Sequence, residues 1–370
     1  DIKESITSGY LMNTLNIGQS IIFIAGLRVE NEDNFYKSKY SPQQIGGFPV
    51  PIGVVYDTTA SHQETIWLPN FHLNFKATDF LNIRLAVYKA LSRPDFNMRL
   101  NNYFAWRPAA TSSTKQLFVG NPLLKTAQAW NYEINTSFYG NKIGLISVSA
   151  FYKEIDNMYH MLNGINTSGN VLLEHLGLQW KTLHDGTYAL TVPYNSPKPS
   201  KVWGFEFEHQ INFTFLPGLL KNFVLSYNAS NVRSETHLIS TAIDTIKYYV
   251  PGIPFPFYKY EERPIETKQQ LENQPEFYGN ISLGYDIGGF SARISLFHQS
   301  EYNLSFTPSG RGDQIVNAFT RLDLALKQQI TDYLSVMLNV SNLTNIKEEN
   351  SIYNRVNGYK ILNFSERYGL

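Results

Sequence analysis

The chain has 370 residues, with 31 basic and 31 acidic side chains and no cysteine. Its balanced charge offers no electrostatic attraction to a phosphate backbone, so no nucleic-acid partner is expected. The absence of cysteine excludes a disulfide framework and thiol chemistry. No run of about 18 apolar residues occurs, which excludes membrane-spanning helices.

Paired stretches of alternating apolar and polar residues recur along the chain. In the clearest stretch, residues 203–213, Trp203, Phe205 and Phe207 fall on one side of a strand. Glu206 and Glu208 fall on the other side. A charged side chain facing lipid near the midplane costs about 2–4 kcal/mol, so in a membrane sheet the two carboxylates would face away from lipid.

Six hairpins are predicted, and together they supply about twelve strands. They join 8–16 to 20–30, 68–76 to 83–89, 130–139 to 143–153, 203–215 to 223–231, 278–285 to 290–299 and 319–328 to 336–341. The turns within these hairpins are short. The connections between them are long loops at 34–64, 93–126, 157–200, 236–272 and 342–363, with a shorter link at 304–315.

Short turns on one side and long loops on the other predict an all-β fold, a transmembrane antiparallel up-and-down β-barrel. In a compact soluble domain, loops of such length would argue against the strand assignment. A soluble β-sandwich remains an alternative, because it produces the same alternation along its strands.

Aromatic residues in the long loops are candidates for ligand binding. In the segment 248–260, prolines stiffen a loop that displays aromatic rings, which could stack on sugars, aromatic chelators or apolar ligands. The alternative is that these rings pack loop against loop or sit at the membrane interface. The candidate ligand-binding residues are Tyr103, Phe104, Trp106, Arg107, Trp180, Tyr248, Tyr249, Phe255, Phe257 and Tyr258.

Charged residues of both signs alternate with the apolar residues along the predicted strands. They are expected to face the lumen, where they would hydrate the interior of the barrel. The predicted lumen-facing residues are Arg28, Glu30, Arg84, Glu133, Glu206, Glu208, Arg293, Arg321, Asp323 and Lys327.

Enzymatic and metal-binding interpretations find little support in the residues. Glu206 and Glu208 share a face, but the sequence places no histidine or third carboxylate beside them, so no catalytic residue is predicted. His160, His175 and His184 occur in one predicted loop with a spacing that matches no metal-ligand pattern. We therefore predict no metal site and no cofactor.

Five collinear segments carry a resemblance to a known family. They are LPNFHLNFKATDFLNIRLAVYKALSRPDF (68–96), GNPLLKTAQAWNYEINTSFY (120–139), SVSAFYKEIDNMY (147–159), GNISLGYDIGGFSARISLFHQSEY (279–302) and LNVSNLTN (338–345). These segments resemble, in the same order, the TonB-dependent outer-membrane receptors of Gram-negative bacteria. Such receptors are plugged barrels of 22 strands.

This resemblance implies that residues 1–370 form one partial barrel domain in the bacterial outer membrane. The N-terminal plug domain, the early strands and the final strand of the same longer chain are expected to lie outside this sequence. A twelve-strand barrel closed on itself is the alternative. Open strand edges are not tolerated in hydrocarbon, so the sheet must be closed in one of these two ways.

The resemblance also implies a function, the energised and ligand-gated import of a specific nutrient. The expected partners are outer-membrane lipid, the plug domain, the TonB energy-coupling machinery and a surface lipoprotein. Two other functions stay open: a structural barrel subunit within a larger outer-membrane complex, and a passive porin. The richness in Asn, Lys, Ile and Tyr suggests a Bacteroidetes source, but the nature of the substrate is left open among siderophores, glycans, cobalamin and peptides.

Overall fold

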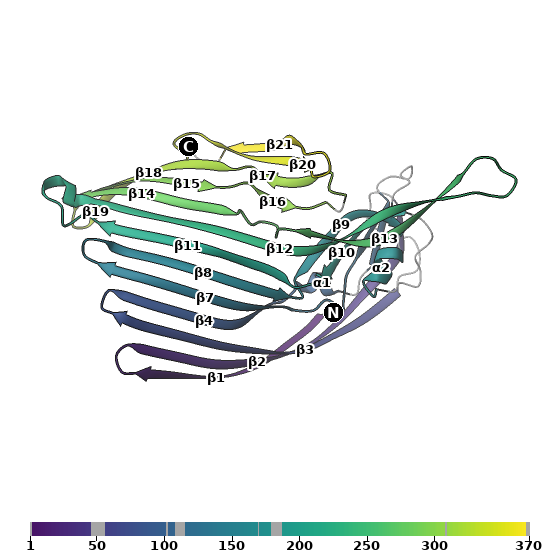
Figure 1. Cartoon of the computed structure of the whole chain (residues 1–370), viewed down its shortest axis with the longest axis horizontal. Coiled ribbons are helices and arrows are strands. Elements are labelled where there is room, and N and C mark those ends of the chain that lie inside the picture. Colours follow the sequence, from purple (N-terminus) through teal and green to yellow (C-terminus); the bar gives the residue numbers. More distant parts are fainter. Residues whose placement is uncertain are drawn as a thin grey trace.

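The computed structural model of the chain describes residues 2–45, 56–100, 103–107, 115–168, 170–178, 187–307 and 309–367. Within them, one curved wall of antiparallel strands dominates, and smaller elements gather at one end of it (Figure 1). Neither of the two α-helices in these ranges has the length and apolar character needed to cross a bilayer.

The wall contains twelve strands, each paired with the wall strands that precede and follow it in the sequence. They are β1 (Ile2–Ile17), β2 (Ile21–Ile45), β3 (Tyr56–Thr78), β4 (Leu81–Ser92), β7 (Ala127–Gly140), β8 (Gly144–Asp156), β11 (Ser200–Asn212), β12 (Phe223–Tyr248), β14 (Phe277–Ile287), β15 (Phe290–Gln299), β18 (Phe319–Thr331) and β19 (Leu334–Val340). The six predicted hairpins are confirmed. Among the described residues, β1 and β19 form the two edges of the wall.

Short turns join the hairpins at one end of the wall, on the left of Figure 1. Between β14 and β15, Gly288 and Gly289 have φ angles of +54° and +83°. Positive φ at both central residues suits a two-residue hairpin turn, because its twist matches that of the flanking strands. The turn predicted at 216–218 is longer in the structure, where the 3₁₀-helix η1 (Gly218–Asn222) precedes β12.

The end of the wall opposite the short turns contains more strand than the long loops predicted there. In place of the predicted loop 34–64, β2 and β3 continue as a ladder as far as the pair Tyr40 and Tyr56. The other long connections predicted as loops also contain strands, and two of them contain a short α-helix. The reason is general, because ladder pairing satisfies backbone N–H and C=O groups that a structureless loop would leave to water.

The elements of these connections pair mostly with one another. They are α1 (Phe96–Arg99), β5 (Tyr103–Arg107), β6 (Lys115–Val119), β9 (Tyr159–Ser168), α2 (Asn170–His175), β10 (Thr187–Asn195), β13 (Phe257–Gln269), β16 (Tyr302–Ser305), β17 (Asp313–Val316), β20 (Lys347–Asn354) and β21 (Tyr359–Arg367). β13 pairs with the far half of β12, and the two project as an arm beyond the other elements (Figure 1).

We call the elements β5, β6, β9, β10, α1 and α2 the end unit. The main apolar core of the described residues lies there. β10 pairs with β9 on one side and with β6 on the other. Leu117, Leu172, Leu190 and Val192 are completely buried there. Many large apolar side chains of the wall are exposed instead, as Phe205 is at 64%. Lipid is the medium that would cover them.

His160 connects the end unit to the wall. Its Nε2 lies 2.8 Å from the hydroxyl oxygen of Thr236 in β12, and its ring lies 5.9 Å from the ring of Tyr194 in β10. Burial lowers the pKa of His160 to about 4. The folded unit therefore favours the neutral imidazole.

This depressed pKa predicts that the end unit loosens in acid. An unfolded histidine has a pKa of about 6.5, so the opened unit binds a proton between pH 6.5 and 4 that the folded unit does not. The stabilisation is complete above pH 6.5 and is lost as the pH falls toward 4. Amide hydrogen exchange in β9 and β10, corrected for the intrinsic rate, should accelerate by at most about tenfold per pH unit in this range. An equal acceleration in His160→Gln would contradict the assignment.

Candidate functional site

One face of the wall carries polar residues on every strand. The register places Arg84 opposite Asn74 and Asn135, and Glu206 opposite Ser149. The Asn135 side-chain amide donates to the hydroxyls of Ser147 and Ser149, both at 2.8 Å. The same register relation places ten charged residues on this face, namely Arg28, Glu30, Arg84, Glu133, Glu206, Glu208, Arg293, Arg321, Asp323 and Lys327.

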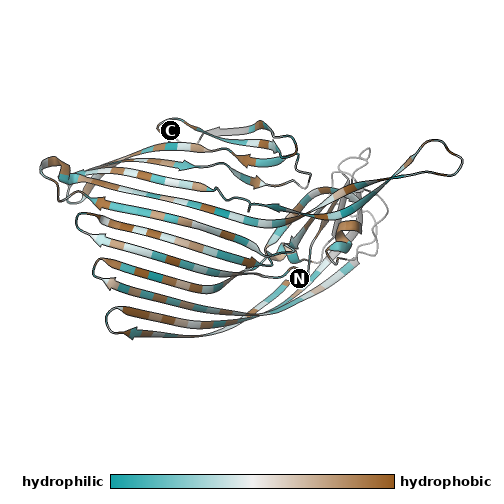
Figure 2. Cartoon of the chain, viewed as in Figure 1, coloured by the Kyte–Doolittle hydropathy of each residue, from teal (hydrophilic) through white to brown (hydrophobic). Residues whose placement is uncertain are grey.

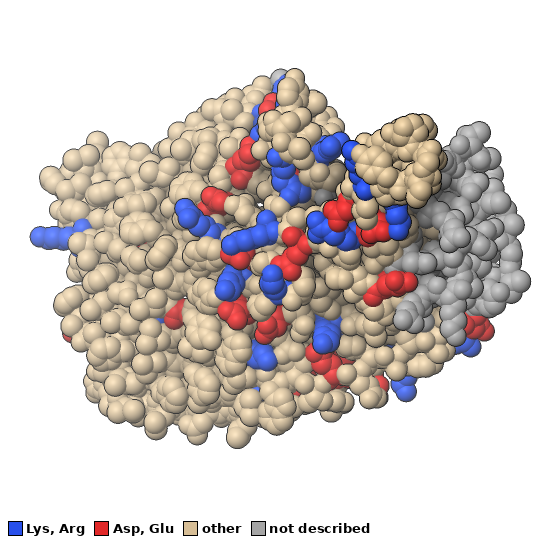
Figure 3. Space-filling model, turned by 45° about the vertical axis from the view of Figure 1, so that its right-hand side comes forward, with Lys and Arg blue, Asp and Glu red and all other residues tan. Residues whose placement is uncertain are grey.

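The other face of the wall is apolar. Ile134, Phe205 and Leu283 alternate with the polar residues along their strands and are 39–64% exposed with their neighbours Ile294 and Leu296. The alternation is visible as stripes along the strands in Figure 2. Figure 3 shows a broad surface with few charged side chains, while Lys, Arg, Asp and Glu gather toward the end unit. A wall with one polar and one apolar face fits a boundary between water and lipid.

Some of the charged groups on the polar face are already paired. Arg293 donates two hydrogen bonds to the Asp286 carboxylate, at 2.9 and 2.6 Å. The Tyr88 hydroxyl donates to the Glu133 carboxylate at 2.8 Å. Glu206 and Glu208, by contrast, are exposed. The polar face thus combines a self-paired part with carboxylates open to a partner.

A buried ion cluster lies where the polar face meets the end unit. Arg93 donates to the Glu30 carboxylate at 2.5 Å and to the Glu32 carboxylate at 2.9 Å. Arg99, in α1, donates to the other oxygen of Glu32 at 2.6 Å. The side chains of Arg99 and Glu32 are only 1% and 3% exposed. Charges so deeply buried are tolerated because each one is paired and hydrogen-bonded.

Arg99 also holds the chain that leads into β7. Its Nε donates to the backbone carbonyl of Leu124 and its second guanidinium nitrogen donates to the Thr126 hydroxyl, both at 3.0 Å. The ion cluster of Glu30, Glu32, Arg93 and Arg99 therefore fixes both ends of the connection between β4 and β7 to β2.

A group of possible metal ligands lies beside the cluster. One ligand atom from each of Glu32, His62 and Glu64 falls within 4.8 Å of the others. Glu64 accepts from the Thr126 backbone N–H at 3.2 Å and lies 3.4 Å from His62. Glu32 is paired with two arginines as described above, so guanidinium groups supply the positive charge that a cation would otherwise bring to it.

Sequence reasoning found Glu30 but missed the rest of the ion cluster. Glu32, Arg93 and Arg99 were not proposed as functional residues, although Arg93 begins the Arg-Pro-Asp-Phe segment that carries part of the family resemblance. The two-residue spacing of Glu30 and Glu32 on one strand face was the available signal. Nothing local in the sequence indicates that Arg99 reaches Glu32.

Five of the predicted ligand-binding aromatics lie on the arm of β12 and β13. The Tyr248 and Phe257 rings stack at 5.7 Å, and the Phe257 ring lies 5.8 Å from that of Phe255. Lys247 lies 5.3 Å from the centre of the Tyr249 ring. Exposure of 45–61% for Tyr248, Tyr249, Phe255 and Tyr258 leaves these rings open for contact.

The remaining candidates are placed less fully. Tyr103, Phe104, Trp106 and Arg107 form β5, which pairs with β6 and with the end of β2, but their side chains lie outside the described part of the structure. Trp180 lies outside the described residues altogether. Ligand contact by these five residues stays a prediction.

Comparison with known proteins agrees with this architecture. Residues 1–343 match the family model described as "TonB dependent receptor-like, beta-barrel". Because that match covers most of the sequence, the chain belongs to this family. It is a β-barrel protein of the bacterial outer membrane. No protein with a curated function matches it.

Solved structures with the same fold include three outer-membrane receptors. The hemophore receptor HasR of Serratia marcescens, solved with its hemophore HasA and heme, aligns with a TM-score of 0.60, 13% identity and coverage of 93% of this chain and 49% of its own. The ferric enterobactin receptor PfeA of Pseudomonas aeruginosa aligns with a TM-score of 0.57 and 13% identity, over 100% of this chain and 53% of its own. The ferric yersiniabactin uptake receptor FyuA of Yersinia pestis aligns with a TM-score of 0.56 and 13% identity, over 100% of this chain and 45% of its own. The chain thus spans about half the length of these structures.

Removing Arg99 should destabilise the end unit strongly. Arg99→Met leaves the Glu32 carboxylate buried with one cation fewer, and breaking a buried pair from one side costs about 3–5 kcal/mol. We expect faster limited proteolysis of residues 93–126 and faster hydrogen exchange in β6. The exposed pair of Arg263 and Asp244 provides the control, because Arg263→Met should cost less than about 1 kcal/mol. If Glu32→Gln combined with Arg99→Met fails to recover part of the loss, the uncompensated charge is not the cause.

Proposed function

We propose that this chain supplies part of the barrel wall and the extracellular surface of an energised, ligand-gated importer of the outer membrane. Family membership is the observation that carries the proposal. The polar face suits a hydrated interior, and the exposed aromatic arm at the end opposite the short turns suits ligand capture outside the cell. No step in this function makes or breaks a bond in the substrate.

Closure of the wall is the first requirement of this function. The backbone groups on the outer sides of β1 and β19 need partners in hydrocarbon. We propose that further strands of a longer chain pair with these two edges and complete a 22-stranded barrel, as in plugged outer-membrane transporters. The half-length coverage of the solved receptors supports this arrangement.

A plug domain of the same longer chain would occupy the lumen. Glu206 and Glu208 are exposed on the polar face and could accept charge-assisted hydrogen bonds from such a plug. Arg84 is exposed on the same face and could donate them. The TonB machinery would then pull on the plug to open a path, which requires a difference in plug contacts between the closed and open states.

The aromatic arm limits the class of ligand. Stacked, exposed rings favour a ligand with a flat apolar or aromatic surface, such as an aromatic chelate or the face of a sugar ring. The HasR structure contains a hemophore as well as heme, which supports a surface protein as a second candidate for docking on the arm. A surface lipoprotein would be one such partner. A protein partner would bury the arm over a larger area than a small ligand would.

Energised uptake can be tested with a panel of labelled ferric siderophores, heme, cobalamin, oligosaccharides and peptides. Cells expressing the full-length receptor should accumulate at least one of these ligands, and a protonophore should stop the accumulation. The variant Tyr249→Ala/Phe255→Ala/Tyr258→Ala should lower uptake by about tenfold or more. Stacking of a flat ligand ring on an aromatic side chain, as measured for nucleic-acid bases, is worth about 1–3 kcal/mol per contact. Lys221→Ala at the short-turn end is the matched control. Accumulation that continues with the protonophore would favour a passive porin.

Loss of the plug-binding charges should make the barrel leak. In the variant Arg84→Gln/Glu206→Gln/Glu208→Gln the plug loses charge-assisted hydrogen bonds, which are worth about 1.5–3 kcal/mol each. We expect increased killing of cells by large antibiotics that the intact receptor excludes. Lys142→Gln and Lys221→Gln, in the short turns, should leave permeability unchanged. Equal permeability of all variants would refute contact between these charges and a plug.

A further inference from the structure

The apolar face of the wall is layered in rows that run across five strands. The row nearest the end unit carries two cations and two carboxylates, and it runs in strand order through Lys89, Trp130, Glu154, Lys201 and Glu235. The next row toward the short turns consists of Val87, Tyr132, Tyr152, Trp203 and Arg233. The third consists of Leu85, Ile134, Ala150, Phe205 and Asn231. Successive rows lie about 7 Å apart, because residues two apart on a strand share a face.

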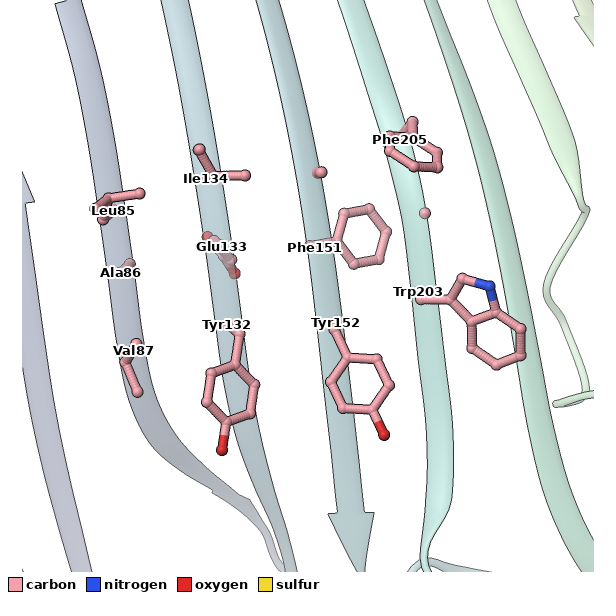
Figure 4. A pocket seen from close by; sticks show the side chains of 12 residues that line it. Leu85, Ala86, Val87, Tyr132, Glu133, Ile134, Phe151, Tyr152, Trp203 and Phe205 are labelled. Carbon is pink, nitrogen blue, oxygen red and sulfur yellow. The ribbon is translucent and has the colours of Figure 1, made fainter.

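A hollow interrupts this face at the third row. Ala150 lies opposite Ile134 on one side and Phe205 on the other, and its single methyl group leaves the space between these larger side chains unfilled. The hollow measures about 430 Å³. The exposed lining of the hollow is almost entirely apolar. Among the residues around it are Tyr132, Tyr152, Ile134, Phe205 and Trp203 (Figure 4).

Two cations lie next to the hollow. Arg233 is exposed directly opposite Trp203, and Lys201 lies one row beyond. In the described part of the chain neither one forms an ion pair. Two carboxylates flank Lys201 on the adjacent strands. Glu235 pairs with Lys268 at 2.6 Å, and Glu154 accepts from the Tyr152 hydroxyl at 3.0 Å and keeps its charge. With Lys89, Lys201, Arg233 and Lys268 against these two carboxylates, the patch still carries a net positive charge.

An apolar hollow, a band of aromatic rings and a patch of net positive charge therefore follow one another along the strand direction. This is the order in which a membrane lipid presents its acyl chain, its interface and its headgroup. Lys89, in the outermost row with Lys201, lies 6.0 Å from the centre of the Trp130 ring. An anionic headgroup is favoured there, because each cation near an anionic membrane surface contributes about 1 kcal/mol.

We propose that this face is a binding site for one phosphorylated lipid of the outer leaflet. One acyl chain fills the hollow over Ala150, and the headgroup phosphate is held by Arg233 and Lys201. A free phosphate ion would gain the cations but leave the hollow empty, so both parts of one lipid molecule are required. The proposal rests on the outer-membrane location of the family and is independent of import.

The test is native mass spectrometry of the full-length receptor in mild detergent, titrated with bisphosphorylated hexa-acyl lipid A. Phosphatidylcholine, whose zwitterionic headgroup has no net charge, is the comparison, and inorganic phosphate is the competitor. Lys201→Gln/Arg233→Gln removes the cations, and Ala150→Phe fills the hollow. Lys142→Gln/Lys221→Gln and Ala229→Phe are the matched controls, since Lys142 and Lys221 lie at the short turns and Ala229 lies on the apolar face outside the hollow lining.

We expect one lipid A molecule to be retained at concentrations at which phosphatidylcholine is not retained. Removal of the two cations should raise the apparent Kd by about tenfold or more, and filling the hollow should raise it as well, while the controls stay within about twofold. Equal affinity in all variants, equal retention of phosphatidylcholine, or displacement of the lipid by millimolar phosphate would each overturn the proposal. Because Lys201→Gln/Arg233→Gln changes only exposed or half-exposed side chains, it keeps the test decisive if Ala150→Phe does not fold.

Discussion

Every backbone N–H and C=O group within a bilayer must have a hydrogen-bond partner in the protein, and the rest of this structure depends on that constraint. The twelve wall strands meet it by pairing each strand with its neighbours in sequence order, which needs only tight turns at one end. Side chains are then free to alternate between two media. The polar and apolar faces of the wall are a consequence of this backbone arrangement.

The same backbone requirement extends beyond the wall. Segments at the far end could rely on water, yet they form ladders, as in the extension of β2 and β3 and the arm of β12 and β13. Ladder pairing restricts the backbone conformations of these segments, and a preorganised surface loses less conformational entropy when it binds a partner.

The ion cluster and the end-unit core contribute to the structure in different ways. Leu117 and Leu190 stabilise the end unit by apolar burial, which is not directional. Arg99 and Glu32 fix where that unit sits on the wall, since paired charges this deeply buried tolerate few alternative geometries. Together the two sets of contacts hold a small folded unit at the end of a sheet whose own faces are left for lipid and water.

The sequence by itself determined the number and order of the wall strands, the short-turn end and the two faces, because the period-two alternation and turn residues are local signals. It also marked Tyr248, Tyr249 and Phe255 as exposed aromatics through their prolines. Only the tertiary structure decided that the long connections are strands, that Arg99 reaches Glu32 across more than 60 residues, and that Ala150 opens a hollow between Ile134 and Phe205. Such contacts depend on the register between distant strands, and the composition of any one segment does not encode it.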